Sequence, residues 1–350
     1  IRVWQGLYSY SGFTRLDLFR EKAILYNTAL ILFLIMEKKL KGIFSMSYIY
    51  LSAAMFIVGS SVVVGKIISF DFPLFLASAL RFLVAALLLL PMGVYKRKLF
   101  CLSRHDWYII STMAFCGQIL FTILLLLGLR YTSGISAGTL TSTTPFFMAL
   151  IAFAFLGERF SAWQIFGLLL SFSSIIFLSI DTFRLMLEGG SFSWLGNLLI
   201  LAAVASEAVF LLFAKKLDQQ LSGLEITAIL SLLGFLLCLP PAFIEAASFN
   251  FNVLGTADIL AILYFGAVYT DLAYICWFRG IAAASAAVAS AFTAVMPLSA
   301  TLLSTFLLKE DISAWQLIAL LTAVIAILVL AKAENERKTC DGSARNQLQG

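Results

Sequence analysis

The sequence predicts an all-α polytopic membrane protein, in which ten transmembrane helices form two inverted five-helix repeats around a central cavity. Three observations support this fold class. The 350 residues are 61% hydrophobic and only 12% charged, whereas soluble globular domains are about 45–50% apolar and about 25% charged. About ten apolar runs of roughly 20 residues follow one another along the chain. The stretch from Gly128 to Gln164 returns without a gap from Gly280 to Gln316.

Residues 1–46 precede the first predicted span and differ from the rest of the chain. The apolar run from Ala23 to Met36 is shorter than the roughly 18–20 residues that a spanning helix needs. No small-residue cleavage site of a signal peptide follows it. We therefore expect residues 1–46 to be an N-terminal extension, and our hypothesis is that Met36 is the natural start.

The predicted spans are each long enough, at about 1.5 Å of rise per residue, to cross about 30 Å of hydrocarbon. We expect a first five-helix repeat over residues 47–181, a second over 182–332, and a polar, disordered tail over 333–350. The spans lie near residues 47–67, 73–94, 107–129, 133–156, 161–180, 194–214, 223–243, 257–279, 282–307 and 313–332.

Clusters of Lys and Arg predict the orientation of these spans. Such clusters favour the cytoplasmic side of a membrane, and here they all fall on one side of the predicted bundle. Both termini and the tail are therefore expected to be cytoplasmic. The net charge of +5 comes from these short clusters between apolar runs, so it does not indicate nucleic-acid binding. The clusters are Lys38, Lys39 and Lys41; Lys96, Arg97, Lys98 and Arg104; Lys215 and Lys216; and Lys332, Arg337 and Lys338.

The internal repeat predicts the inverted arrangement. Pro297 minus Pro145 and Glu310 minus Glu158 are both 152, while nearer the start of each repeat the offset is 149. Each repeat holds five predicted spans, and an odd number of crossings makes the second copy begin on the opposite face. Repeats of this kind place a substrate site near mid-membrane, between the halves, and expose it to each side in turn. This is the design of a carrier.

The repeated motif resembles a known family. The resemblance rests on Pro145 followed by Leu156-Gly157-Glu158-Arg159 and Trp163-Gln164, on the matching Pro297, Lys309-Glu310 and Trp315-Gln316, and on the stretch from Tyr274 to Gly280. The chain resembles the EamA-type branch of the drug/metabolite transporter superfamily over nearly all of residues 47–332. This resemblance implies a carrier in the inner or plasma membrane, most often an exporter of amino acids or other small metabolites.

Three charged residues break the repeat and are the strongest candidates for a site. Arg81, Glu207 and Asp271 lie inside predicted spans, whereas their counterparts in the other half are apolar. A charge at mid-bilayer costs at least about 2.5–3.5 kcal/mol, so it is normally paired or faces a polar pathway. Our hypothesis is that one acid carries a coupling proton or a substrate amine, and that Arg81 holds a substrate carboxylate or the acid itself. The alternative is a buried ion pair that locks helices together.

Other residues are weaker candidates for the same pathway. Tyr274 lies on the helical stripe around Asp271, and Gln118 adds polarity to span three. Pro145 and Pro297 are expected to kink spans four and nine, because proline lacks an N–H and clashes with the carbonyl four residues before it. The freed carbonyls would belong to Thr141 and Thr293, which are pathway candidates for this reason.

Other classes of function receive less support. The sequence lacks the HExxH, GxSxG and P-loop patterns and contains a single histidine, so we expect no enzyme, no cofactor and no metal site. The rival reading within the enzymes is an intramembrane aspartyl-type hydrolase, in which Glu207 and Asp271 would share a proton. A channel or a non-transporting membrane sensor is a further alternative. The expected partners are the lipid bilayer, a small-molecule substrate and a coupling proton or counter-substrate.

Overall fold

The computed structural model describes residues 46–67, 73–94, 102–131, 140, 143–187, 194–217, 221–251, 255–308 and 314–348. The chain divides into two units, Ile1–Met46 and Ser47–Gly350, and the fold described below is that of the second unit. The expected N-terminal extension and the proposed start at Met36 lie outside the described residues, apart from Met46 itself.

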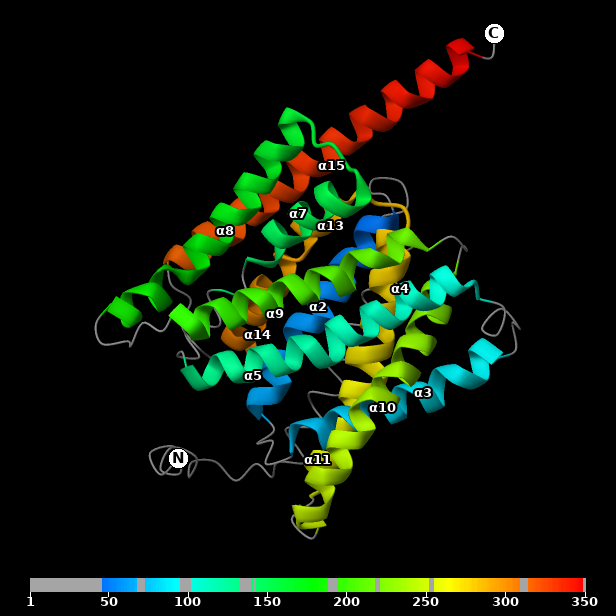
Figure 1. Cartoon of the computed structure of the whole chain (residues 1–350). Coiled ribbons are helices and arrows are strands. Elements are labelled where there is room, and N and C mark those ends of the chain that lie inside the picture. Colours follow the sequence, from blue (N-terminus) through cyan, green and yellow to red (C-terminus); the bar gives the residue numbers. More distant parts are fainter. Residues whose placement is uncertain are drawn as a thin grey trace. The chain divides into compact units, whose positions relative to one another are not determined.

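Every regular element among the described residues is a helix (Figure 1). Their bounds are α2 (Met46–Ile67), α3 (Leu74–Val94), α4 (Arg104–Ala114), η2 (Phe115–Leu120), α5 (Phe121–Tyr131), α7 (Thr144–Leu156), α8 (Ala162–Leu187), α9 (Trp194–Leu212), η3 (Phe213–Lys216), α10 (Gly223–Ser248), α11 (Thr256–Leu263), η5 (Tyr264–Leu272), α12 (Ala273–Ile281), α13 (Ala286–Phe292), α14 (Val295–Leu308) and α15 (Ala314–Leu348).

The helices confirm a polytopic membrane protein. Six helical segments of the described chain are long and apolar enough to cross a bilayer, and four further apolar helices are shorter, at 10–17 residues. One expectation was wrong. Residues 333–350 were predicted to be disordered, but α15 continues as a helix through Leu348. The six longer segments are Leu74–Pro91, Arg104–Gly128, Trp194–Lys216, Gly223–Ser248, Thr256–Ile281 and Ala286–Leu303.

Two composite helices share an unusual construction at corresponding positions of the repeat. The segment α4–η2–α5 and the segment α11–η5–α12 each change from α-helix to π-helix and back. The π-helical residues 115–120 correspond at the offset of 152 to residues 267–272, inside η5. The N-terminal caps correspond as well: Ser103 accepts a hydrogen bond from the Asp106 amide, and Asp258 accepts one from the Gly255 amide. The repeated sequence therefore forms a repeated local structure.

Contacts between helices repeat in the same way. A Cβ on Gly128 would lie 2.6 Å from Ile200 Cδ1, and a Cβ on Gly280 would lie 2.7 Å from Leu51 Cγ. Gly280 is Gly128 plus 152, and Ile200 is Leu51 plus 149. Both glycines let two helices approach more closely than any side chain would allow, which is how helices associate where lipid offers no hydrophobic gain.

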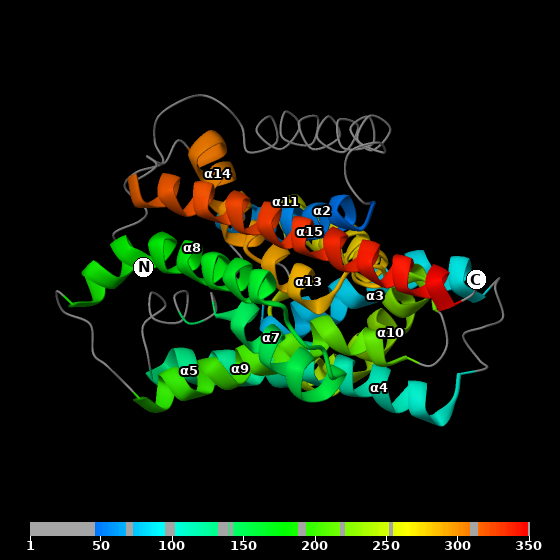
Figure 2. The ribbon, with the colours of Figure 1, turned by 90° about the horizontal axis from the view of Figure 1, so that it is seen from above.

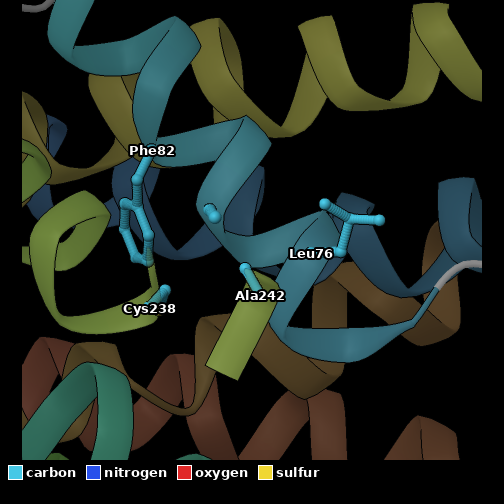
Figure 3. Packing of buried hydrophobic residues seen from close by; sticks show 5 residues of the cluster. Leu76, Phe82, Cys238 and Ala242 are labelled. Carbon is cyan, nitrogen blue, oxygen red and sulfur yellow. The ribbon is translucent and has the colours of Figure 1, made fainter. Parts of the chain in front are cut away.

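Corresponding helices also pack directly on each other. Helix α3 packs along α10, and α8 packs along α15, as Figures 1 and 2 show. Between α3 and α10 lies a cluster of buried apolar side chains (Figure 3): Leu76, Ala79, Phe82, Cys238 and Ala242. The Leu76 amide also donates a hydrogen bond to Glu245 of α10, at 2.8 Å. The α3–α10 contact is thus apolar along its length and polar where α3 begins.

The two prolines of the repeated motif each lie in the first turn of a helix. Pro145 lies in the first turn of α7 instead of in the middle of a helix, where its missing N–H leaves no bond unmade. Pro297 lies in the first turn of α14, after a break at residues 293–294 that separates α14 from α13. The prolines that lie inside helices are Pro91 of α3 and Pro240 and Pro241 of α10, and Pro91 and Pro240 correspond at the offset of 149.

The close helix contact at Gly280 predicts a position-specific loss of stability. Gly280→Ser should lower the midpoint of thermal unfolding in detergent, because its Cβ would overlap the Leu51 side chain, and overpacking typically costs about 1–3 kcal/mol. Adding Leu51→Ala should recover part of the loss. The matched control is Gly255→Ser, where a Cβ would meet no atom closer than 3.6 Å. Equal midpoints for the two serine variants would contradict this packing.

Candidate functional site

Arg81 lies in α3 with its guanidinium between two aromatic rings. The guanidinium carbon is 4.4 Å from the ring centroid of Phe82 and 5.4 Å from that of Tyr269 in η5. The side chain is half-buried, and no carboxylate of the described chain forms an ion pair with it. Stacking on aromatic faces stabilises a cation by about 0.5–2 kcal/mol, but it leaves the hydrogen-bond donors of the guanidinium available.

Tyr274, in α12, is the residue around which the polar groups gather. Its ring packs on Phe210 of α9, with the centroids 5.1 Å apart. The Tyr274 hydroxyl lies near enough to Arg81, Glu207, Tyr269 and Cys238 for their charges to act on it. The structure therefore brings Arg81, Tyr274 and Glu207 together from three different helices. We call these three residues the Tyr274 site.

Glu207 reaches this site from α9. The Thr144 hydroxyl, at the start of α7, donates a hydrogen bond to Glu207 Oε2 at 3.3 Å. The Glu207 side chain is half-buried. A single long hydrogen bond satisfies only a small part of what a carboxylate can accept, so Glu207 keeps free acceptor capacity toward the Tyr274 site.

Trp277 fixes the distance between α12 and α9 at this site. It is buried, and its indole N–H donates to the Leu211 carbonyl at 2.9 Å. In a continuous α-helix this carbonyl would accept from residue 215, but α9 ends at Leu212 and the 3₁₀ segment η3 follows. The indole thus pairs a carbonyl that the change of helix type leaves free.

Asp271 and Gln118 are buried, but no contact joins them to the Tyr274 site. Asp271 is 5% exposed, and neither of its carboxylate oxygens has a hydrogen-bond partner among the described residues. Gln118 lies in η2, where its Nε2 donates to the Leu230 carbonyl at 3.0 Å and ties span three to α10. No hydrogen bond of the described residues therefore joins Asp271 to the Tyr274 site, although Asp271 lies only three positions before Tyr274 in sequence.

The two threonine candidates have different outcomes. Thr293 is buried at the break before α14, and its hydroxyl donates to the Ser290 carbonyl. This bond closes the last turn of α13, so the hydroxyl serves its own helix. Thr141 lies outside the described residues.

Sequence reasoning missed four residues of this region: Tyr269, Phe210, Trp277 and Thr144. Tyr269 and Trp277 lie in the same span as Asp271, but nothing in their spacing separates them from ordinary packing residues. Thr144 directly precedes Pro145, which the sequence analysis singled out. The sequence does not show that Thr144 donates a hydrogen bond to Glu207. In the described part of the chain no group of three His, Cys, Asp or Glu side chains lies close enough to hold a metal ion.

Comparisons with known proteins match the internal repeat of the sequence. The sequence profile of the EamA-like transporter family matches twice, over residues 45–180 and 194–332. An uncharacterized transporter of Bacillus subtilis, YetK, is 41% identical over 266 residues, which covers 75% of this chain and 80% of that protein. A chloroplastic WAT1-related protein of Arabidopsis thaliana is 25% identical over 261 residues, covering 73% of this chain and 62% of that protein.

A solved structure shares the fold. One crystal structure superposes with a TM-score of 0.66 and covers 82% of this chain and 98% of its own. The sequence identity to that protein is 17%, so the likeness concerns the arrangement of the helices alone.

The bond between Trp277 and Leu211 predicts a structural role for the indole. Trp277→Phe should lower the thermal unfolding midpoint, because it leaves a buried carbonyl without a donor, at a cost of about 1–3 kcal/mol. Trp194→Phe is the matched control, since Trp194 is 69% exposed at the start of α9. If both variants unfold at the wild-type temperature, the indole does not hold α12 on α9.

Proposed function

Because the chain belongs to the EamA-like transporter family, we propose that it is a secondary active transporter that exports a small metabolite, such as an amino acid or a related compound, by alternating access. The observation that carries this proposal is the meeting of Arg81, Tyr274 and Glu207 between helices of the two repeats. These charges are absent from the corresponding positions of the other half. A repeated scaffold with an unrepeated polar site is what a carrier of an asymmetric substrate needs.

We propose that ten spans form the scaffold, as two inverted five-helix repeats with both termini in the cytoplasm. The corresponding glycine contacts and the corresponding π-helical segments support this arrangement. The packing of α3 on α10 and of α8 on α15 supports it as well, because equivalent helices meet at a pseudo-two-fold axis. The four shorter apolar helices would complete the count of ten.

The Tyr274 site has the chemistry to hold a small zwitterion. The Arg81 guanidinium presents N–H donors in the fork geometry that fits a carboxylate. Glu207 offers a carboxylate to an ammonium group, and Tyr269 and Phe210 offer apolar faces. Glu207 is also the candidate for a coupling proton, since a carboxylate can bind either a proton or the substrate amine at one position. A counter-substrate would serve equally as the driving partner.

One contact would close the cytoplasmic side of this carrier. Glu158, in the loop after α7, accepts a hydrogen bond from Lys215 Nζ at 3.1 Å. The same carboxylate accepts from the Ala286 amide at the start of α13, at 3.2 Å and 3.0 Å to its two oxygens. We call this set the Glu158 contact. It joins a loop of the first repeat to two elements of the second, so it has to break when the repeats separate.

The hydrolase alternative gains no support from the geometry. A shared proton requires two carboxylates within hydrogen-bond reach. Glu207 has Thr144 as its described partner, and Asp271 has none among the described residues. A channel and a non-transporting sensor are distinguished from a carrier by transport kinetics.

A metabolite-panel counterflow assay in proteoliposomes tests the proposed function. We expect at least one amino acid or related metabolite to give saturable uptake that is accelerated by unlabelled substrate inside the vesicle. Unsaturable flux would indicate a channel, and no flux with any tested compound would indicate a sensor. Either outcome contradicts the carrier.

The same assay tests the site. Arg81→Gln and Glu207→Gln should each lower counterflow at least tenfold, because each removes about 1.4 kcal/mol or more of charge-assisted substrate binding. Arg279→Gln is the matched control, since Arg279 is exposed near a span end and lies 5.9 Å from the Tyr50 ring. Normal counterflow by both site variants at normal expression would remove the Tyr274 site from the substrate path.

The Glu158 contact predicts a change in access. In a background with Cys238 as the only cysteine, Glu158→Gln should speed labelling of Cys238 by an impermeant maleimide several-fold in inside-out vesicles. The reason is that Cys238 is buried in the packed α3–α10 contact, which joins the two repeats and should loosen when they separate. Asp258→Asn, at the cap of α11, is the control. An unchanged labelling rate in Glu158→Gln would show that this contact closes nothing.

A further inference from the structure

Three buried oxygen-bearing side chains share an unusual state. Asp271 is 5% exposed, Gln118 3% and Ser231 0%. Both carboxylate oxygens of Asp271, Oε1 of Gln118 and Oγ of Ser231 have no hydrogen-bond partner among the described residues. Buried polar atoms are nearly always paired, and an exception calls for an explanation such as a bound ion or water. The cost of leaving them unpaired is higher in a membrane, where no bulk water reaches them.

Gln118 and Ser231 lie on the same contact between η2 and α10. Gln118 Nε2 donates to the carbonyl of Leu230, the residue before Ser231. The Gln118 Oε1 atom lies against Gly234, where a Cβ would be only 2.2 Å away. Ser231 and Gly234 are three residues apart and therefore share a face of α10. Ser231 therefore lies on the side of α10 that Gln118 Oε1 meets at Gly234.

Asp271 belongs to the neighbouring contact, in which the same face of α10 meets span eight, the segment α11–η5–α12. A Cβ on Gly223 would lie 2.8 Å from the Ile275 carbonyl oxygen, so the face that begins at Gly223 packs on span eight. Thr227 and Ser231 continue that face at intervals of four. Helix α10 and span eight run in opposite directions (Figure 1). Asp271, one turn before Ile275, therefore lies level with the turn from Thr227 to Ser231.

The described part of the chain supplies no cation for Asp271. Arg81 is the basic residue of the neighbouring α3, but its guanidinium is stacked on Phe82 and Tyr269. No ion pair between Arg81 and Asp271 is present among the described residues. An ionised carboxylate without a partner is among the most costly groups that a membrane helix can bury. A bound monovalent cation would balance that charge.

We propose that Asp271, Ser231 and Gln118 form a Na⁺ site between η2, α10 and η5. All three groups offer oxygen atoms, the ligands that hard cations prefer. One carboxylate matches the single charge of Na⁺, whereas divalent sites usually gather more acidic residues. The hydroxyl of Thr227 donates to the Gly223 carbonyl at 2.7 Å, so its oxygen lone pairs stay available as a further ligand.

This site would hold the coupling ion of the carrier, and to that extent the inference rests on the proposed function. Asp271 is three residues before Tyr274, so binding at one position and binding at the other act on the same span. Asp271 lies within the π-helical segment η5, and such segments occur frequently at functional sites. Ion binding itself can be measured without any transport.

Thermal unfolding of the purified full-length chain in detergent tests the proposal. The wild type is measured in choline chloride, KCl and NaCl at constant ionic strength. NaCl alone should raise the unfolding midpoint by about 2–5 °C, as expected for a ligand well above its dissociation constant. Asp271→Asn should abolish this rise, and Ser231→Ala should increase the half-saturating NaCl concentration several-fold.

The control is Ser171→Ala. Ser171 is also fully buried with an unpartnered hydroxyl, but it lies in α8, away from this contact. It should keep the full response to NaCl. If Asp271→Asn folds poorly, Ser231→Ala alone still decides the question, because its side chain carries no charge.

Three results would overturn the site. The first is an equal unfolding midpoint in KCl and NaCl for the wild type. The second is a full NaCl response in both site variants. The third is an unfolding midpoint that rises at acid pH and does not respond to NaCl. The last result would mean that Asp271 binds a proton. A Na⁺ response without counterflow would support the Na⁺ site and contradict the carrier function. Counterflow without a Na⁺ response would support the carrier function and contradict the Na⁺ site.

Discussion

The structure depends on one constraint: a polar atom inside an apolar helical bundle has to find its partner within the protein. Most of the buried polar atoms described here obey it. The Trp277 indole pairs the carbonyl that is freed where α9 becomes 3₁₀, and the Gln118 amide pairs the carbonyl of Leu230. Each such bond joins two helices, because the acceptor belongs to a different span. The groups that do not obey the constraint, Asp271 first among them, are therefore the places where function is expected.

The same constraint explains why the repeat is visible in some features and absent in others. Small residues such as Gly128 and Gly280 keep helices close, and both halves need this equally. A substrate has one orientation and one charge distribution, so its binding groups have no reason to repeat. Arg81 and Glu207 accordingly have apolar counterparts, Leu230 and Val58. Symmetry thus marks the scaffold, and its loss marks the site.

Much of the fold could be predicted from the sequence, because composition, apolar run length and a fixed offset are properties of the chain itself. The family resemblance, the helical class and the membrane setting are confirmed. The course of the backbone at Pro145 and Pro297 could not be predicted from the sequence. A proline is compatible both with a kink inside a helix and with a first turn, and only the course of the backbone before it decides between them. The helical tail was missed because polarity alone does not distinguish a disordered segment from an extended helix.

The candidate site was predictable only in part. Charges in apolar runs pointed to Arg81, Glu207 and Asp271. Nothing in the sequence shows that Arg81 and Glu207 both lie near Tyr274, or that Asp271 has no hydrogen bond to them. Gln118 looked like a cavity residue, yet its amide group is buried against α10. Distances between spans depend on packing, and packing is decided by side chains on several helices at once.

Inversion of the two halves can be tested by labelling single cysteines placed at the N-terminal caps of α4 and α11. Ser103 and Gly255 correspond at the offset of 152 and cap equivalent helices. If the halves are inverted, Ser103→Cys should react with an impermeant maleimide only from the cytoplasmic side, and Gly255→Cys only from the external side. Labelling of both cysteines from the same side would contradict the inverted repeat, and with it the carrier mechanism.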